Sequence, residues 1–226
     1  IGLDHQETLG DSLTAIAEQK AGIFKSGKSA VIANLAPEAQ LVCQKTATNL
    51  GVSLYQDNKD FSFQNGNFSS SLADFNHLIL GLEGAYQEEN AALALQAFLL
   101  FMVQRNEKVD QEAVRAALQA TKWAGRLEAV TEHIYLDGAH NLPALERLVE
   151  FIQEKIQQGY QSQILFGALK RKDYSGMLET LQTGLPESEL ILTTFHYGEV
   201  VAQGDRQDLP YVADYKAYIK EFMDQS

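Results

Sequence analysis

Apolar residues in the first half of the chain follow two spacings, one helical and one of short continuous runs. Helical spacing predicts four helices, at residues 12–23, 37–50, 88–104 and 110–120. Short apolar runs predict strands at residues 29–33, 52–55 and 77–82. Residues 57–74 are polar, except that Phe61, Phe63 and Phe68 recur in alternation. This pattern predicts a hairpin at a domain edge.

Residues 121–128 break the helical pattern, and strands and helices then alternate regularly. Strands are predicted at 134–136, 163–167 and 190–194, and helices at 142–156, 174–181 and 214–223. Such alternation favours a parallel sheet with helices on both faces. The predicted fold class is therefore α/β, with two units that join near residue 122 and cover residues 1–122 and 123–226.

Composition and charge exclude several classes of protein. Of the 226 residues, 45% are apolar and 21% are charged, as in an ordinary globular protein. The formal net charge of −12 repels nucleic acid and anionic membranes, so we expect neither as a partner. Cys43 is the single cysteine, so no internal disulfide can form. No apolar run reaches the roughly 18 residues of a membrane helix. We expect a soluble, cytoplasmic protein, truncated or processed in front of Ile1.

The first candidate for chemistry lies at 4–10, Asp-His-Gln-Glu-Thr-Leu-Gly, followed by Gln-Lys-Ala-Gly-Ile at 19–23. His5 can bind a metal ion through a neutral imidazole nitrogen. Taken alone, however, His5 is more simply a surface or capping histidine. By the same reasoning, Lys20 is more simply a solvated lysine on a helix.

A second candidate is the sequence Ile-Tyr-Leu-Asp-Gly-Ala-His-Asn at 134–141. A strand here delivers Asp137 and His140 onto a loop that leads directly into a helix. Gly138 permits the tight turn, and Asn141 can cap the helix. A helix start is electropositive and suits phosphate oxygens. A plain strand–helix junction is the alternative, and the compact polar sequence favours a phosphate site.

Three further positions are weaker when taken singly. Arg126 offers a planar guanidinium fork that suits phosphate, although an arginine near a domain junction is often only a surface residue. Asn90, near the start of the long helix after Gly84, could read an adenine edge with its amide or could help to cap that helix. Lys172 and Asp173 can be explained simply as a charged helix start.

Together, five segments resemble the folylpolyglutamate synthase and dihydrofolate synthase family, a branch of the Mur-type ligases. In chain order they are GLDHQETLGDSLTAIAEQKAGIFK, LEGAYQEENAALALQAF, WAGRLE, YLDGAHN and FGALKRKDY. The resemblance covers almost the whole chain. Glu7 and Leu9 stand where the cell-wall Mur ligases have aspartate and histidine, which indicates the folate branch. These motifs do not tell whether the enzyme also makes dihydrofolate.

The resemblance implies a fold and a reaction. Residues 1–122 would be the remainder of a P-loop-type central ATPase domain, and residues 123–226 a smaller, Rossmann-like carboxyl-terminal domain. The implied enzyme is an ATP-dependent ligase that adds L-glutamate to folates through an acyl phosphate. Its implied cofactors are ATP and Mg²⁺, its substrates are folate and L-glutamate, and we expect a monomer.

The resemblance also implies residue roles. Lys20 matches the family's carbamylated lysine, and His5 matches a ligand of the same Mg²⁺. Carbamylation would turn a cation into an anionic oxygen ligand, which Mg²⁺ prefers. Asn90 matches the asparagine that contacts adenine. Arg126, Asp137 and His140 match contacts to the nucleotide and its phosphates, and His140 is also a catalytic candidate.

The family's P-loop has no counterpart in these 226 residues. Gly27 and Lys28 are adjacent, but no glycine-rich loop precedes them. We therefore expect residues 1–226 alone to bind ATP weakly and to be inactive. Two alternatives stay open, another Mur-type amino-acid ligase and a non-catalytic binding module.

Overall fold

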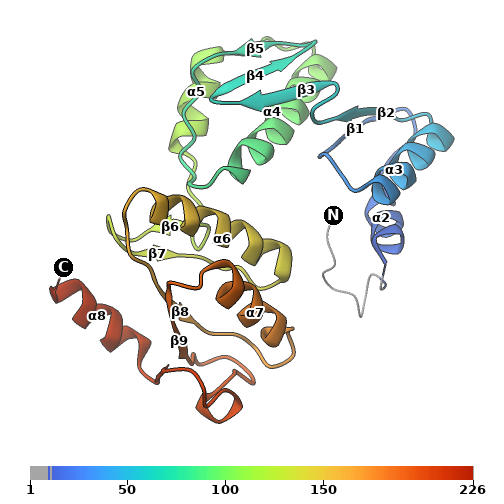
Figure 1. Cartoon of the computed structure of the whole chain (residues 1–226). Helices are drawn as coiled ribbons and strands as arrows, with labels where there is room; N and C mark the ends of the chain where they lie inside the picture. The colour runs from blue at the N-terminus through green and yellow to red at the C-terminus, as the bar shows by residue number, and fades with distance from the viewer. Residues whose placement is uncertain (1–9, 11, 226) are drawn as a thin grey trace. The chain divides into compact units, whose positions relative to one another are not determined.

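The computed structural model describes residue 10 and residues 12–225. The chain forms two compact units, Ile1–Leu136 and Asp137–Ser226 (Figure 1). Both units combine helices with strands, which confirms the predicted α/β class. The predicted junction near residue 122 falls inside the first of these units. The assignment of residues 1–122 and 123–226 to two ligase domains stays a prediction. No helix in the described part of the chain is long and apolar enough to cross a membrane.

The described part of the first unit contains, in chain order, a helix and then a parallel strand pair. Helix α2 (Leu13–Ala21) packs against α3 (Pro37–Leu50), which connects β1 (Ser29–Ile32) to β2 (Ser53–Gln56). The hydroxyl of Ser12 accepts a hydrogen bond from the Ala15 N–H at 3.2 Å and caps α2, as predicted. Pro37 suits the first turn of α3, and Gly51 ends the helix at φ +63°, a left-handed conformation that favours glycine.

An antiparallel sheet follows and confirms the predicted hairpin. Its strands are β3 (Phe61–Gln64), β4 (Asn67–Ser70) and β5 (Asp74–Phe75) (Figure 1). Asn65 and Gly66 join the first two strands and both have positive φ, which is the backbone that a two-residue hairpin requires. The alternating phenylalanines face one side of this sheet. There they pack against α4 (Tyr86–Arg105) and α5 (Gln111–Ala120) in one apolar cluster.

The predicted strand at 77–82 is wrong. Its backbone finds partners other than a neighbouring strand, because the Leu78 N–H donates to the Gly66 carbonyl at 2.7 Å. The Gly81 N–H donates to the Leu118 carbonyl at 3.0 Å, at the end of α5. The segment therefore runs from the hairpin turn to a helix end, and its apolar residues reflect burial at single positions such as Leu78.

The predicted strand at 134–136 exists, but not in a parallel sheet. As β7 (Tyr135–Leu136) it pairs antiparallel with β6 (Glu128–Ala129). The residues between β6 and β7 do not include an obvious hairpin motif. The helix that follows β7 continues the alternation of strands and helices, and this alternation predicts a parallel sheet.

The second unit contains a parallel sheet whose three strands lie in the order β10-β9-β8. Its strands are β8 (Gln163–Phe166), β9 (Glu189–Thr193) and the short β10 (Tyr211–Val212), and its helices are α6 (Leu142–Gln157), α7 (Tyr174–Gly184) and α8 (Tyr215–Gln225). A 3₁₀ turn spans Gln203–Asp205. Leucines of α6 and α7 pack with those of β9 in one core. Strand β10 has only two residues, too few for a sequence pattern to reveal.

Gln96 is an exception in the core of the first unit. Its side chain on α4 is fully buried, and neither its amide nitrogen nor its amide oxygen has a hydrogen-bond partner within the described residues. A buried amide without partners costs about 1–3 kcal/mol. In residues 1–226 we therefore expect Gln96→Met to raise the free energy of unfolding by about 1 kcal/mol.

Urea denaturation measures this change, and Gln87→Met is the matched control. Gln87 is also buried on α4, but its amide oxygen accepts a hydrogen bond from Asn90 at 2.9 Å, so its replacement should destabilise the chain. Equal effects of the two substitutions would contradict the prediction.

Candidate functional site

Two of the predicted motifs lie against each other in the first unit. Leu127, next to Arg126, is buried, with 2% of its surface exposed. A Cβ atom placed on Gly84 would lie 2.8 Å from the Leu127 Cδ1 atom, so the two segments are in close contact. Gly84 also has φ +100°, which side chains rarely adopt. The start of α4 and the Gly125–Leu127 turn therefore form one surface region.

Asn90 and Arg126 both expose their side chains from this region. The Asn90 side-chain nitrogen donates to the Gln87 Oε1 atom at 2.9 Å, which orients the amide. The Arg126 N–H donates to the Trp123 carbonyl at 3.2 Å, and the Gly125 N–H to the Glu128 carboxylate at 2.8 Å. Within the described part of the chain, the Arg126 guanidinium has no ion pair. The region thus offers an amide and a cation to a ligand.

The loop that opens the second unit has the predicted form. The half-buried Asp137 accepts a hydrogen bond from the Ala139 N–H at 2.7 Å. The exposed His140 places Nδ1 2.9 Å from the Gly138 carbonyl. Since a carbonyl only accepts, Nδ1 must donate, and Nε2 of a neutral ring is left as an acceptor for a ligand. The loop therefore fixes the orientation of both side chains.

Asn141 ends this loop and caps α6, as predicted. Its side-chain oxygen accepts from the Ala144 N–H at 3.0 Å, and Pro143 lies in the first turn. The start of a 16-residue helix carries a partial positive charge and suits an anion. The start of α6 can therefore hold a phosphate oxygen. Contact of Asp137 and His140 with a nucleotide stays a prediction.

Lys20 belongs to a different helix, α2. It lies exposed in the last turn of α2, just before Gly22. His5, its predicted partner at a magnesium ion, lies outside the described residues. Among the residues that the structure describes, no group of three or more His, Cys, Asp or Glu side chains could hold a metal ion. Because His5 lies outside the described residues, the magnesium site formed by His5 and Lys20 stays a prediction.

Cations that sequence reasoning missed follow the strands of the second unit. Lys170, after β8, donates to Asp205 at 2.8 Å, and this bond raises the pKa of the lysine and lowers that of the carboxyl. Arg206, beyond β9, makes two hydrogen bonds to Asp208, at 2.8 and 2.7 Å. This fork lowers the Asp208 pKa to about 2. Carboxyl ends of parallel strands commonly carry ligand sites, and the run Lys170 to Lys172 was the available signal.

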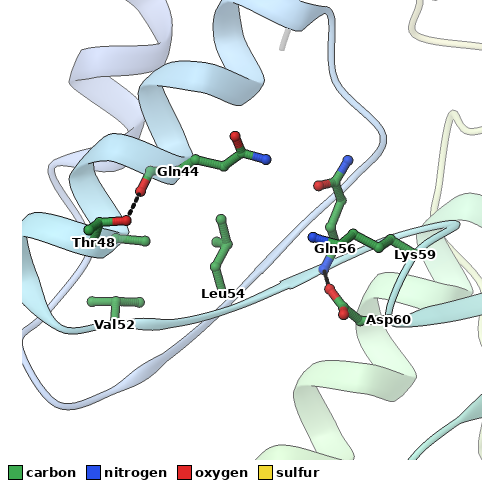
Figure 2. A pocket seen from close by; sticks show the side chains of 8 residues that line it. Gln44, Thr48, Val52, Leu54, Gln56, Lys59 and Asp60 are labelled. Atoms are coloured by element: carbon green, nitrogen blue, oxygen red, sulfur yellow. Dashed lines mark hydrogen bonds between the residues drawn. The ribbon is translucent and has the colours of Figure 1, made fainter.

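A pocket of about 360 Å³ lies elsewhere, between α3 and β2 (Figure 2). Gln44, Gln56 and Lys59 contribute polar groups to it, and the Gln56 N–H donates to Asp60 at 2.8 Å. None of the predicted site residues that the structure describes lines this pocket. Its walls hold one lysine and one aspartate but no histidine or cysteine, so it offers no evident catalytic pair.

Comparison with known proteins supplies the family. No family model matches the chain. The chain is 31% identical over 192 residues to folylpolyglutamate synthase of Lacticaseibacillus casei, covering 80% of this chain and 44% of the relative. It is 32% identical over 194 residues to dihydrofolate synthase/folylpolyglutamate synthase of Bacillus subtilis, covering 81% and 45%.

The chain also matches a solved structure, a complex of folylpolyglutamate synthase with AMPPCP and folate. The match covers all of this chain and 59% of the chain in that structure, with a TM-score of 0.80 and 26% sequence identity. The chain thus spans less than half the length of the two curated relatives. These relatives and the shared fold confirm the resemblance, and the chain belongs to the folylpolyglutamate synthase and dihydrofolate synthase family.

Proposed function

We propose that the complete gene product containing residues 1–226 is an ATP-dependent ligase that adds L-glutamate to the γ-carboxylate of folates. The observation that carries this proposal is the similarity to the two bacterial relatives, which are named as synthases of this type. The folylpolyglutamate synthase complex with AMPPCP and folate supports ATP and folate as ligands. We further propose Mg²⁺ as a cofactor and a monomer in the cytoplasm.

We propose that ATP binds to exposed residues near the start of α4 and to residues of the loop before α6. Asn90 reads the adenine edge with its amide, and Arg126 donates its guanidinium fork to phosphate oxygens. Asp137 and His140 contact the nucleotide from the loop before α6, whose N-terminus favours the negative charge. In this proposal, each of these groups binds part of the nucleotide.

The reaction we propose has two steps. The folate γ-carboxylate attacks the γ-phosphorus of ATP, so that an acyl phosphate forms and ADP leaves. The amine of L-glutamate then attacks the acyl carbon, an amide bond forms, phosphate leaves, and the amine loses a proton. Water must be kept from the acyl phosphate, which it would hydrolyse. Folate labelled with ¹⁸O in its carboxylate should transfer label to the released phosphate, and unlabelled phosphate would exclude the acyl phosphate.

Lys20 carries a prediction of its own. If Lys20 is carbamylated, the intact protein should be heavier by the mass of one CO₂ when it is measured by native mass spectrometry from bicarbonate buffer. Fragmentation of the protein in the spectrometer should place this added mass on a fragment that contains Lys20. Lys20→Arg should abolish this gain, whereas Lys25→Arg, also at an exposed position, should leave it unchanged. An unmodified Lys20 in active protein would contradict the proposed carbamate.

Release of ADP tests the proposed function. With ATP and Mg²⁺, we expect ADP from the complete gene product only when a reduced folate and L-glutamate are both present. Residues 1–226 alone should release none, because the family's P-loop has no counterpart in these residues. A complete gene product that ignores folate but accepts a cell-wall precursor would support another Mur-type ligase. No ADP with any acceptor would favour a non-catalytic binding module.

A second activity is favoured by one specific observation. The Bacillus subtilis relative is named for both dihydrofolate synthase and folylpolyglutamate synthase. A bifunctional enzyme would also join L-glutamate to dihydropteroate. ADP release with dihydropteroate in place of folate distinguishes the bifunctional enzyme from one that only extends folates.

A further inference from the structure

Two side-chain amides meet at the start of α4, one buried and one exposed. Gln87 is 5% exposed and lies one helical turn before the buried Ala91, on the same face of the helix. Asn90, three residues after Gln87, is exposed. The Asn90 Nδ2 atom donates to the Gln87 Oε1 atom at 2.9 Å. An exposed amide that could otherwise rotate is therefore held by a partner inside the protein.

Gln87 is itself fixed by contacts that reach beyond α4. Its backbone N–H donates to the Gly84 carbonyl at 3.0 Å, and a Cβ atom on Gly84 would lie 2.8 Å from the Leu127 Cδ1 atom. Leu127 is 2% exposed and follows Arg126 directly. Burial in a close-packed interior also leaves a side chain few alternative conformations. Gln87 is therefore a fixed acceptor for Asn90.

The hydrogen bond to Gln87 decides which groups Asn90 can offer to a ligand. A primary amide has two N–H donors and one carbonyl acceptor, and donation to Gln87 uses one N–H. The other N–H and the Oδ1 atom of Asn90 remain for a ligand. An asparagine amide makes two hydrogen bonds to adenine, because its oxygen accepts from the N6 amino group while its N–H donates to N7. The orientation of Asn90 thus suits adenine.

The same orientation disfavours a purine that has an oxygen at position 6. Guanine and hypoxanthine carry the O6 carbonyl where adenine has its amino group, and a carbonyl only accepts. With Asn90 held by Gln87, its Oδ1 atom would face O6, and neither of these acceptors would have a donor. An Asn90 amide that rotates freely could turn over and donate to O6 instead. The acceptor at position 87 therefore distinguishes the two kinds of base.

We propose that Gln87 is a specificity-determining residue, which fixes the Asn90 amide so that the nucleotide site selects adenine over purines with O6. Gln87 is a positioning residue, because it contacts Asn90 and acts on the base through it. The inference rests on the proposed function in one respect, namely that Asn90 contacts the base of ATP. It does not require the ligase reaction.

Titration calorimetry of the complete gene product with ATP and with inosine triphosphate tests the proposal. Inosine triphosphate has O6 in place of the N6 amino group and a proton on N1. Gln87→Met removes the acceptor at similar size, whereas the carboxylate of Gln87→Glu can only accept and so keeps Asn90 as the donor. Both nucleotides are measured on the same preparation, so the ratio of their dissociation constants does not depend on the folded fraction.

Gln96→Met is the matched control. Gln96 is also a buried glutamine on α4, but its side chain has no hydrogen-bond partner within the described residues. Its replacement changes the same residue type on the same helix without affecting Asn90. Circular dichroism confirms that each variant folds.

We expect the unaltered protein to bind ATP at least roughly tenfold more tightly than inosine triphosphate. Gln87→Met should reduce this ratio by roughly fivefold, the effect of about one net hydrogen bond. Gln87→Glu and Gln96→Met should keep the ratio. An unchanged ratio in Gln87→Met would overturn the proposal, and so would an equal reduction in Gln96→Met.

Asn90→Ala separates failure of this inference from failure of the proposed function. If Asn90→Ala lowers the ratio and Gln87→Met does not, Asn90 reads the base without Gln87, and only the inference fails. If neither variant changes the ratio, both the inference and the proposed role of Asn90 are wrong. Absence of binding to either nucleotide would overturn the proposed function together with the inference. Binding requires neither folate nor L-glutamate, so a failed ligase assay does not affect this test.

Discussion

Arg126→Ala is expected to lower kcat/KM for ATP by roughly a hundredfold in the complete gene product. An arginine fork can make two charge-assisted hydrogen bonds to phosphate, and their loss costs about 3 kcal/mol in total. Since each 1.36 kcal/mol is a factor of ten in rate, this loss corresponds to roughly a hundredfold. The structure supports the role because Arg126 is exposed beside the start of α4, on a turn fixed by the buried Leu127.

Steady-state kinetics at varied ATP concentration measure this effect. Arg126→Lys keeps the charge but loses the planar fork, so an intermediate activity is expected. Arg105→Ala is the matched control. Arg105 is an exposed arginine at the end of α4 that pairs with Glu107 at 2.6 Å, and its loss should leave the kinetics unchanged. Unchanged ATP kinetics in Arg126→Ala would remove Arg126 from the nucleotide site.

Phe68→Ala is expected to lower the free energy of unfolding by about 3–5 kcal/mol. Phe68 is 1% exposed and lies between Phe61 and Phe75, with ring centroids 6.4 and 6.1 Å away. Truncation leaves a cavity at the centre of the cluster that joins the hairpin to α4. For a domain with a total stability of about 5–15 kcal/mol, this loss is a large share.

Urea denaturation of residues 1–226, followed by circular dichroism, measures this loss. Phe222→Ala, at a position that is 40% exposed on α8, should cost less than about 1 kcal/mol. If the two substitutions had equal effects, the phenylalanine cluster would not be the core that the structure shows.

Elements with local signals could be predicted from the sequence. Pro37 and Gly51 set the ends of α3, and Ser12 and Asn141 cap their helices as expected. Asn65 and Gly66 provide the backbone that the hairpin needs. Each of these signals depends on neighbours within a few residues, so no knowledge of the tertiary fold was needed to read them.

Elements that depend on distant partners could not be predicted. The segment at 77–82 has the composition of a strand, but the Leu78 backbone bonds to the hairpin turn and the Gly81 backbone to the end of α5. Strand β7 pairs with β6 instead of joining a parallel sheet. In both cases the hydrogen-bond partner, rather than the residue type, decides the structure.

The candidate site also combines features with local sequence signals and features that depend on distant contacts. The family motifs identified Asn90 and Arg126 one by one, but the contact between Gly84 and Leu127 that joins their segments is long-range. The ion pairs of Lys170 and Arg206 were also missed, since Asp205 and its neighbours carry no motif. Roles in binding ATP and Mg²⁺ stay predictions for Lys20, Asn90, Arg126, Asp137 and His140, and for His5, outside the described residues.

The most direct measurement is the mass of the folate after reaction. The complete gene product is incubated with ATP, Mg²⁺, a reduced folate and L-glutamate, and the folate is analysed by mass spectrometry. The proposed function predicts folate extended by one or more glutamyl residues, with no extension when ATP is omitted. Folate of unchanged mass, from folded protein with all substrates present, would contradict it.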